Sequence, residues 1–350
     1  MSTLTPAALA TQDQGTERRW AGWSRLLGGG WIFVLLLALL VVFTALRPAQ
    51  FATSFNLSTL AVDAAILLVL AVGQTYVIIT AGIDLSVGST LVFASVVSAK
   101  VMLALSGAAG TTYGTTNAGW GVIAIGFVVA VVAGAFWGAV NGVLIAVTRI
   151  PALIVTLGTL GMALGFAQII TDGVDVRAVP QLLIAYIGTG QIAGIPALVV
   201  IAAVVALLAG IALHMTRFGE RTFAVGSNRE AARRAGIPVR QQLIKVYVLC
   251  GALAGVAGLM SVARFGTTTI GGHTVDNLAT ISAVVLGGTS LFGGIGTVFG
   301  TVVGVFIPVI LLNGFVILGI PPFWQTVAMG AVLILAVYVD QLKRRQRERL

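Results

Sequence analysis

Few side chains in this 350-residue sequence are of the types that carry out covalent chemistry. The two histidines, His214 and His273, lie far apart in the sequence, and the single cysteine, Cys250, lies inside an apolar run. No cysteines or histidines have the spacing of zinc ligands, and neither a Walker A phosphate loop nor a Gly-x-Ser-x-Gly nucleophile motif is present. We therefore predict no catalytic residue, no metal site and no cofactor bound by this chain, and the sequence does not favour an enzyme.

One acidic residue stands in a polar break between two apolar runs. Asp84 lies within residues 82–89, which read Gly-Ile-Asp-Leu-Ser-Val-Gly-Ser. Aspartate and serine are preferred at helix starts, where their oxygens accept hydrogen bonds from free backbone N–H groups. The break favours a capping role for Asp84, with gating or solute passage as the alternative. Asp63, near the start of an apolar run, is interpreted as a helix-end or interface residue.

The longest charged segment, residues 216–242, contains the start and stop signals of a short helix. Capping residues come first, an acidic residue follows in the first turn and basic residues in the last, which suits the helix dipole. A glycine and a proline then end the helix. The residues are Ser227, Asn228, Glu230, Arg233, Arg234, Gly236 and Pro238. We predict a helix of about two turns, and it is either a solvated loop helix or a docking element for a cytoplasmic partner.

Neutral polar side chains are spread through the apolar runs. Such groups form hydrogen bonds between helices in a bilayer, or they line a path for a neutral solute. They include Gln74, Thr75, Tyr76, Asn141, Thr156, Gln168 and Asn313. Taken singly, each favours a contact between helices, and passage of a neutral polyol is the alternative.

Apolar helices must position all of these residues. The sequence is 58% hydrophobic and 9% charged, whereas soluble domains have about 25% charged residues. So few charges cannot cover a water-facing surface, and the solvent for most of the chain is therefore lipid. The 44 glycines suit close helix packing in a bilayer. We predict an all-α fold, a polytopic transmembrane helical bundle.

A transmembrane helix needs about 20 mostly apolar residues, and the sequence contains about ten candidates. They are residues 31–46, 60–80, 86–105, 120–148, 152–171, 196–214, 243–263, 276–292, 295–317 and 322–340. The third and eighth are short, and they resemble each other slightly. If both are re-entrant, eight full spans remain, and the two ends of the chain still lie on the same side.

Basic residues predict the orientation, because they gather in cytoplasmic loops. With both termini cytoplasmic, all of the 20 basic residues lie inside except Arg47, Lys100, Arg177 and Arg264. The net charge of +9 therefore reflects the basic residues of the cytoplasmic loops, and we predict no nucleic-acid partner. We divide the chain into a disordered cytoplasmic segment (1–27), a transmembrane domain (28–342) with a retained first span, and a basic cytoplasmic tail (343–350).

Four motifs, in this order, resemble those of a known family. They are residues 82–89; Asn141-Gly142 followed by Pro-Ala-Leu-Ile-Val-Thr-Leu-Gly-Thr at 151–159; Glu-Ala-Ala at 230–232 followed by Gly236-Ile237; and Ala-Val-Val-Leu-Gly-Gly-Thr-Ser-Leu-Phe-Gly-Gly at 283–294. The third looks like the coupling loop of bacterial ABC permeases. Together they are similar to the ribose/xylose/galactose-type permease family, over about residues 57–340.

The resemblance implies a permease subunit of an ATP-driven importer in the bacterial plasma (inner) membrane, which carries a small pentose or hexose sugar. It implies as partners ABC ATP-binding subunits that hold ATP and Mg, an extracytoplasmic solute-binding protein, a second permease chain (identical or related) and membrane lipid. Docking of the ATP-binding subunit would use Asn228, Arg229, Glu230, Ala231, Ala232, Gly236 and Ile237. The translocation path and its gating would use Gln74, Asp84, Ser86, Gly88, Asn141, Thr156, Gly287, Gly288, Thr289 and Asn313.

Two departures from the family concern the substrate. Leu278-Ala279 stand where members often have an acidic residue, and residues 162–165 lack an arginine that many have. Both weigh against a close match to the ribose member. The first alternative is an ABC permease for a nucleoside, a branched-chain amino acid or a furanose signal molecule, although few fixed charges are available for an amino acid. The second is a stand-alone channel or secondary carrier.

Overall fold

The computed structural model describes residues 30–107, 114–273 and 275–347. Its helices are α2 (Trp31–Leu46), α3 (Pro48–Phe51), α4 (Ser54–Ile79), α5 (Val87–Leu105), α6 (Trp120–Val143), α7 (Ala152–Thr171), α8 (Ala197–Met215), α9 (Arg217–Ser227), α10 (Arg229–Arg234), α11 (Val239–Phe265), α12 (Asp276–Leu286), α13 (Val298–Ile317) and α14 (Pro322–Arg347). The predicted all-α class is confirmed. The predicted disordered segment 1–27 lies outside the described residues.

Among the described residues, one π-helical turn continues α6, and a second π-helical turn and four short strands lie in connections between helices. The π-helical turns are Leu144–Thr148 and Leu183–Gly188, and the strands are β1 (Thr115–Thr116), β2 (Val179–Pro180), β3 (Gln191–Ile192) and β4 (Ile195–Pro196). β1 pairs with β2 in parallel, and β3 pairs with β4 antiparallel. Each strand has two residues, so these pairs join loops and form no sheet layer.

Within the described residues, eight helices are long and apolar enough to cross a membrane: α4, α5, α6 with its π-helical turn, α7, α8, α11, α13 and α14. The third predicted span is therefore a full-length helix, α5, with 19 residues. The eighth is much shorter than predicted, because α12 has 11 residues. At 1.5 Å per residue it is about 16 Å long, roughly half of the hydrocarbon thickness of a bilayer.

α4 is the most enclosed of the long helices, and it packs against α5, α8, α11, α12 and α13. Glycines bring other helices into direct backbone contact. Gly134 of α6 faces Gly251 and Gly255 of α11, and a Cβ at Gly134 would collide with their backbone atoms. Small residues allow this close approach of helices in a bilayer. The contact is of the kind that the high glycine content predicted.

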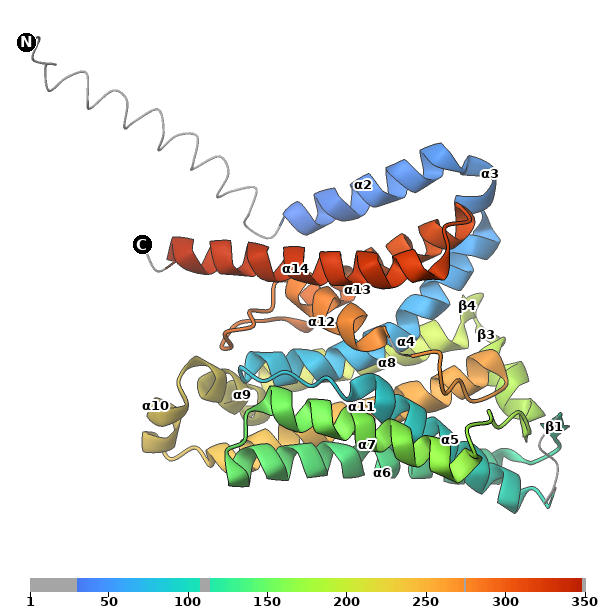
Figure 1. Cartoon of the computed structure of the whole chain (residues 1–350), viewed down its shortest axis with the longest axis horizontal. Helices are drawn as coiled ribbons and strands as arrows, with labels where there is room; N and C mark the ends of the chain where they lie inside the picture. Colours follow the sequence, from blue (N-terminus) through green and yellow to red (C-terminus); the bar gives the residue numbers. More distant parts are fainter. Residues whose placement is uncertain (1–29, 108–113, 274, 348–350) are drawn as a thin grey trace, which may run out of the picture.

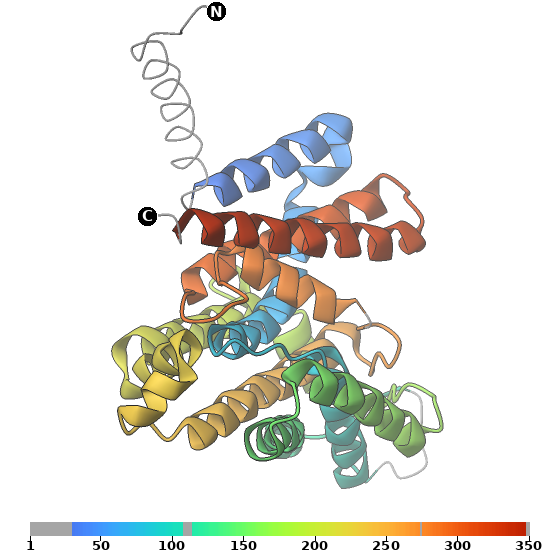
Figure 2. The same cartoon turned by 60° about the vertical axis from the view of Figure 1, so that its left-hand side comes forward.

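The short helices α9 and α10 lie at one end of the bundle, on the side where α2 begins and α14 ends (Figures 1 and 2). α14 continues to Arg347, so it includes most of the predicted basic tail. The segment between α4 and α5 and the segment between α12 and α13 also turn near α9 (Figure 1). The four family motifs are therefore candidates for a common site at this end.

Candidate functional site

The polar break between α4 and α5 is a buried turn held by its own aspartate. Asp84 Oδ1 accepts hydrogen bonds from the Ser86 N–H (2.8 Å) and from the Ser86 hydroxyl (2.6 Å). Both residues are buried, at 2% and 1% exposure. Ser86 occupies the N-cap position of α5 without capping it through its own side chain. Asp84 thus stabilises the turn that precedes the helix, rather than an N–H group inside it.

Residues of α6 and α7 hold this turn from the side. The Asn141 amide donates to the Ser86 hydroxyl (2.8 Å), and its oxygen accepts from Thr159 Oγ1 (2.7 Å). Thr156 Oγ1 donates to the Ile83 carbonyl (3.3 Å). The predicted residues Asp84, Ser86, Asn141 and Thr156 therefore lie in one connected network, which we call the 80–86 network.

A residue of α12 caps the start of α5. The Gly88 N–H donates to Asn277 Oδ1 at 2.7 Å. A Cβ at Gly88 would lie 2.8 Å from this oxygen and 2.8 Å from the His273 carbonyl, so only glycine leaves room for the contact. The cap therefore joins the 80–86 network to α12.

The carboxyl of Asp84 has an unusual environment. Burial raises its pKa above the usual value, and hydrogen bonds from Ser86 and Asn141 oppose the rise. The cost of removing the charge from water is the larger effect. The turn is therefore built around an acid whose protonated form is favoured more than in solution.

The glycine-rich segment 287–297 lies on the other side of the α4 C-terminus. The Gly294 N–H donates to the Ile79 carbonyl at 2.9 Å. Gly287 packs against the backbone of Gly300 in α13, and Gly288 has a φ of +93°. Thr289 is buried. The predicted residues Gly287, Gly288 and Thr289 therefore lie near the end of α4, outside the 80–86 network.

α14 holds this segment from outside. Asp340 Oδ2 accepts from the Leu291 N–H (3.0 Å) and from the Ser290 hydroxyl (3.2 Å). The Arg344 guanidinium lies 4.0 Å from the centre of the Phe292 ring. The segment 287–297 is thus fastened between α4 and α14.

The predicted short helix is confirmed as α10. Asn228 is its N-cap and accepts from the Ala231 N–H at 2.9 Å, and Gly236 follows it with a φ of +80°. The alternative cap, Ser227, is wrong, because Ser227 ends a preceding helix, α9, that we did not predict. Glu230 forms exposed ion pairs with Arg233 (2.9 Å) and Arg234 (3.3 Å), and such pairs contribute little to stability.

α10 has one face against the bundle and one face exposed. Arg229 Nη2 donates to the Thr80 carbonyl at 3.1 Å, and Ala232 is buried in a cluster with Val225 and Leu243. The Ile237 N–H donates to the Ala232 carbonyl at 3.0 Å. Glu230, Ala231 and Gly236 are exposed, and so are most atoms of Asn228 and Arg229. The exposed residues remain available to a partner, whereas Ala232 attaches α10 to its own chain.

Three sequence candidates lie elsewhere. Gln74 is fully buried within α4, and its side-chain amide has no hydrogen-bond partner among the described residues. Asn313 exchanges two amide hydrogen bonds with Asn56, at the opposite end of α4 (2.9 and 3.1 Å). Asp63 is not at a helix end, because α4 begins more than two turns earlier. Its carboxylate lies 3.7 Å from Arg264 of α11.

Sequence reasoning missed several contacts that the fold creates. Thr159 and Asn277 complete the 80–86 network, and their distance from it in the sequence hides them. The Ser261 hydroxyl lies 2.9 Å from His273 Nε2, and His273 Nδ1 lies 2.6 Å from Asp276. These three side chains are connected like the serine, histidine and aspartate of a hydrolase triad, but the serine is buried. They fasten the connection between α11 and α12.

Comparison with known proteins identifies the family. The family model described as "Branched-chain amino acid transport system / permease component" matches residues 56–337. The chain belongs to this family. It is therefore a transport permease, a multi-pass protein of the inner membrane.

Three curated relatives show the similarity along almost the whole chain. The Ribose import permease protein RbsC of Escherichia coli (strain K12) is 38% identical over 89% of this chain and 93% of its own length. The L-arabinose ABC transporter permease protein AraH of Azospirillum brasilense is 34% identical over 93% of each chain. The D-allose transport system permease protein AlsC of Escherichia coli (strain K12) is 32% identical over 89% of this chain and 90% of its own. No solved structure matches.

Proposed function

We propose that this chain is the membrane-spanning subunit of an ATP-driven importer for a small pentose or hexose sugar. The observation that carries the proposal is the direct contact between α10 and the end of α4, from Arg229 to the Thr80 carbonyl. It links an exposed helix to the buried 80–86 network. The names of the relatives support the substrate class, because they specify import of ribose and galactose and transport of allose and arabinose.

In the proposed mechanism, two ATP-binding subunits dock on the exposed face of α10 and carry ATP and Mg themselves. Their closure moves α10, and Arg229 transfers this movement to Thr80 and the 80–86 turn. The transporter thus alternates between two global states that its ligands populate differently. A solute-binding protein delivers the sugar at the opposite end, and a second permease chain, identical or related, completes the assembly.

The buried residues suit a neutral solute. Asp84 is the only aspartate, glutamate, lysine or arginine among the buried residues that the structure describes, and its carboxylate already accepts two hydrogen bonds from Ser86. A zwitterionic amino acid requires compensation of both of its charges when it leaves water. The family description names branched-chain amino acids, so this solute class remains the second candidate.

Affinity purification of the tagged chain from its native membrane, followed by mass spectrometry, tests the assembly. We expect an ATP-binding subunit to co-purify, and a second permease sequence in the sample would indicate a heterodimer. Purified protein that comes out alone and transports in liposomes without ATP would contradict the proposal and favour a stand-alone carrier. In the assembled system, uptake of labelled ribose, allose, galactose, arabinose and leucine separates sugars from amino acids.

The variant Glu230→Lys tests docking on α10. We expect normal expression but a drop of at least tenfold in both uptake and transport-coupled ATPase activity, because the change removes the only carboxylate of α10 and places a further positive charge beside Arg233 and Arg234. Glu220→Lys is the matched control, since Glu220 is an exposed glutamate on the neighbouring helix α9. Normal coupled transport by Glu230→Lys would remove the assigned role of this face.

A further inference from the structure

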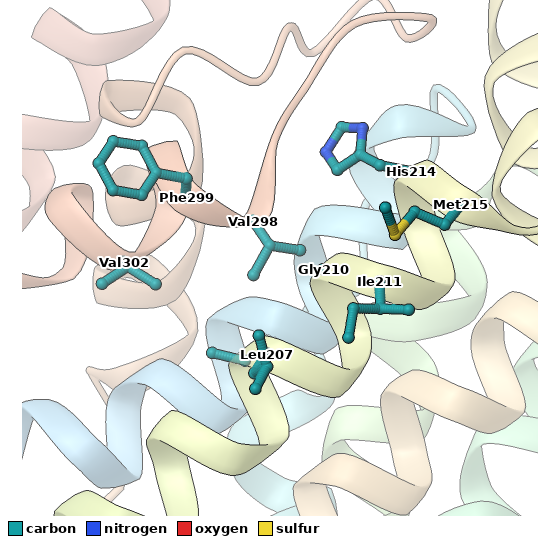
Figure 3. A pocket seen from close by; sticks show the side chains of 9 residues that line it. Leu207, Gly210, Ile211, His214, Met215, Val298, Phe299 and Val302 are labelled. Atoms are coloured by element: carbon teal, nitrogen blue, oxygen red, sulfur yellow. The ribbon is translucent and has the colours of Figure 1, made fainter.

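An apolar groove lies between α8 and the first turns of α13, with a cavity of about 390 Å³ (Figure 3). Leu207 and Ile211 of α8 form one wall, and Phe299 and Val302 of α13 lie opposite. The ring of His214 stands at one end of the groove, and it is the only ionisable side chain of the lining.

The length of the groove matches one leaflet of a bilayer. Its lining on α8 runs from Ala206 to Met215, which is about 14 Å along the helix axis. One leaflet contributes about 15 Å to the hydrocarbon core. The groove therefore extends from one membrane surface to near the bilayer centre, with its His214 end at the surface where α9 begins.

None of the residues that the structure describes covers the groove walls. Leu207, Met215 and Phe299 are 63%, 79% and 70% exposed. In a bilayer these walls contact lipid tails, and a concave apolar surface orders one acyl chain through contacts on several sides. Gly210 and Val298 lie between the walls, and a Cβ added at Gly210 would be in ordinary van der Waals contact with Val298, at 3.9 Å.

Positive charge gathers at the membrane-surface end. α9 begins at Arg217, two residues after Met215, and Arg221 follows one turn later. Both are exposed, and neither forms an ion pair with a carboxylate of the described residues. The rings of His214 and Phe223 lie 5.9 Å apart, so α9 packs against this end of the groove. Basic residues beside a groove between transmembrane helices favour an anionic lipid headgroup.

We propose that this groove binds one anionic phospholipid of the leaflet on the α9 side. One acyl chain lies along α8 between Leu207 and Phe299, and the phosphate lies at Arg217 and Arg221. None of the residues that line the groove is among those predicted for the translocation path. The site places a lipid beside α9, the helix that leads into α10.

Lipid retention tests the acyl-chain part of the site. The chain is purified in mild detergent, and retained phosphatidylglycerol and phosphatidylethanolamine are measured by native mass spectrometry and by extraction. We expect the wild type to retain phosphatidylglycerol selectively, and Gly210→Phe, which fills the groove, to retain at least fivefold less. Leu207→Trp enlarges an exposed side chain of the groove wall and gives a second groove-filling measurement if Gly210→Phe fails to fold. Val204→Phe is the matched control, because Val204 is an exposed residue of the same helix outside the groove.

The double variant Arg217→Gln/Arg221→Gln tests the headgroup part. We expect it to lose the preference for phosphatidylglycerol over phosphatidylethanolamine, whereas Arg149→Gln, at another loop, keeps the preference. Equal lipid retention by wild type and both groove-filling variants would overturn the proposal. So would a groove variant that separates a dimer into single chains without changing bound lipid, because the groove would then be an interface between copies.

Discussion

Two segments of this permease turn at the same end of the bundle, beside the C-terminus of α4, and different kinds of contact hold them there. Residues 80–86 are held by side chains, chiefly those of Asp84, Ser86 and Asn141, and these three residues are buried. Residues 287–297 approach through glycine backbone, with the Gly294 N–H on the Ile79 carbonyl. Their outer part is open, since Phe292 is 44% exposed.

The two kinds of contact differ in how much backbone movement they allow. A side-chain network fixes one geometry, because leaving a buried donor without a partner costs free energy. Glycine backbone contact fixes distance only, and the left-handed conformations at Gly288, Gly293 and Gly294 are open to glycine at little cost. We infer that the 80–86 segment is the more rigid of the two.

The largest expected effect comes from Gly226 of α9, which lies between the C-terminus of α4 and the segment 287–297. An added Cβ at Gly226 would collide with the Ile79 carbonyl and would lie 2.7 Å from the Gly294 nitrogen. We expect Gly226→Ala to lower the free energy of unfolding by about 3 kcal/mol, at the upper end for overpacking, with a matching loss of folded yield. Gly330→Ala is the control, because nothing lies within 4 Å of its added Cβ. Equal thermal stability of the two variants would show that this junction is loose.

The second effect separates the two segments. Asp84→Ala leaves two buried donors of Ser86 without an acceptor, so we expect a loss of about 2–3 kcal/mol and impaired transport. Asp84→Asn keeps an oxygen at this position and should lose less than half as much. The measurement is thermal unfolding in detergent together with uptake. If both variants unfold like the wild type, side-chain bonds do not hold the 80–86 segment.

Acidity provides a third comparison, because only the 80–86 segment contains a carboxyl group. Burial raises the pKa of Asp84 above its usual value of 3.8, so the folded state binds this proton more readily than the unfolded state. The contribution of Asp84 to stability is therefore greatest at low pH and is lost as pH rises through the folded-state pKa. We expect the melting temperature of the wild type relative to Asp84→Asn to rise as pH is lowered from 7.5 to 5. A difference that stays constant, or falls, contradicts this assignment.

The smallest effect concerns the outer side of residues 287–297. Phe292→Leu removes the ring beneath the Arg344 guanidinium, and we expect a loss of about 0.5–1 kcal/mol. Phe292→Tyr keeps an aromatic ring and should behave like the wild type. Thermal unfolding of the two variants side by side measures the difference. If Phe292→Leu lowers the stability as much as Asp84→Ala does, side-chain contacts hold both segments equally strongly and the comparison fails.

Hydropathy predicted the long helices closely, because lipid contact forces whole runs of residues to be apolar. The predicted span 152–171 matches α7 at both ends. The predicted span 31–46 has the bounds of α2, but α2 has 16 residues and is not among the eight helices of the described residues that are long enough to cross a membrane. The prediction was less accurate where a helix is not apolar along its length, and where an apolar segment is not helical. α9 mixes charged and apolar residues and was missed, and the apolar residues after Leu286 do not extend α12.

The candidate site was predicted in part. The types and spacing of Asp84 and Ser86 indicated a helix-start turn, and Asn228 to Gly236 indicated a short helix, because capping and stop signals are local. Asn141 and Thr156 were predicted only as polar residues in apolar helices. Asn141 and Thr156 contact the 80–86 turn and Asn313 does not. This difference depends on how the helices are rotated and packed.

The sequence by itself determined the membrane environment, the helical fold class, the boundaries of most long helices and the local structure of α10, because each depends on composition or on neighbours along the chain. Only the tertiary structure decided that Arg229 reaches Thr80, that Asn277 caps α5 and that Gly226 lies between Ile79 and Gly294. These contacts join residues more than 60 positions apart. Their geometry follows from the packing of several helices at once, which no local pattern specifies.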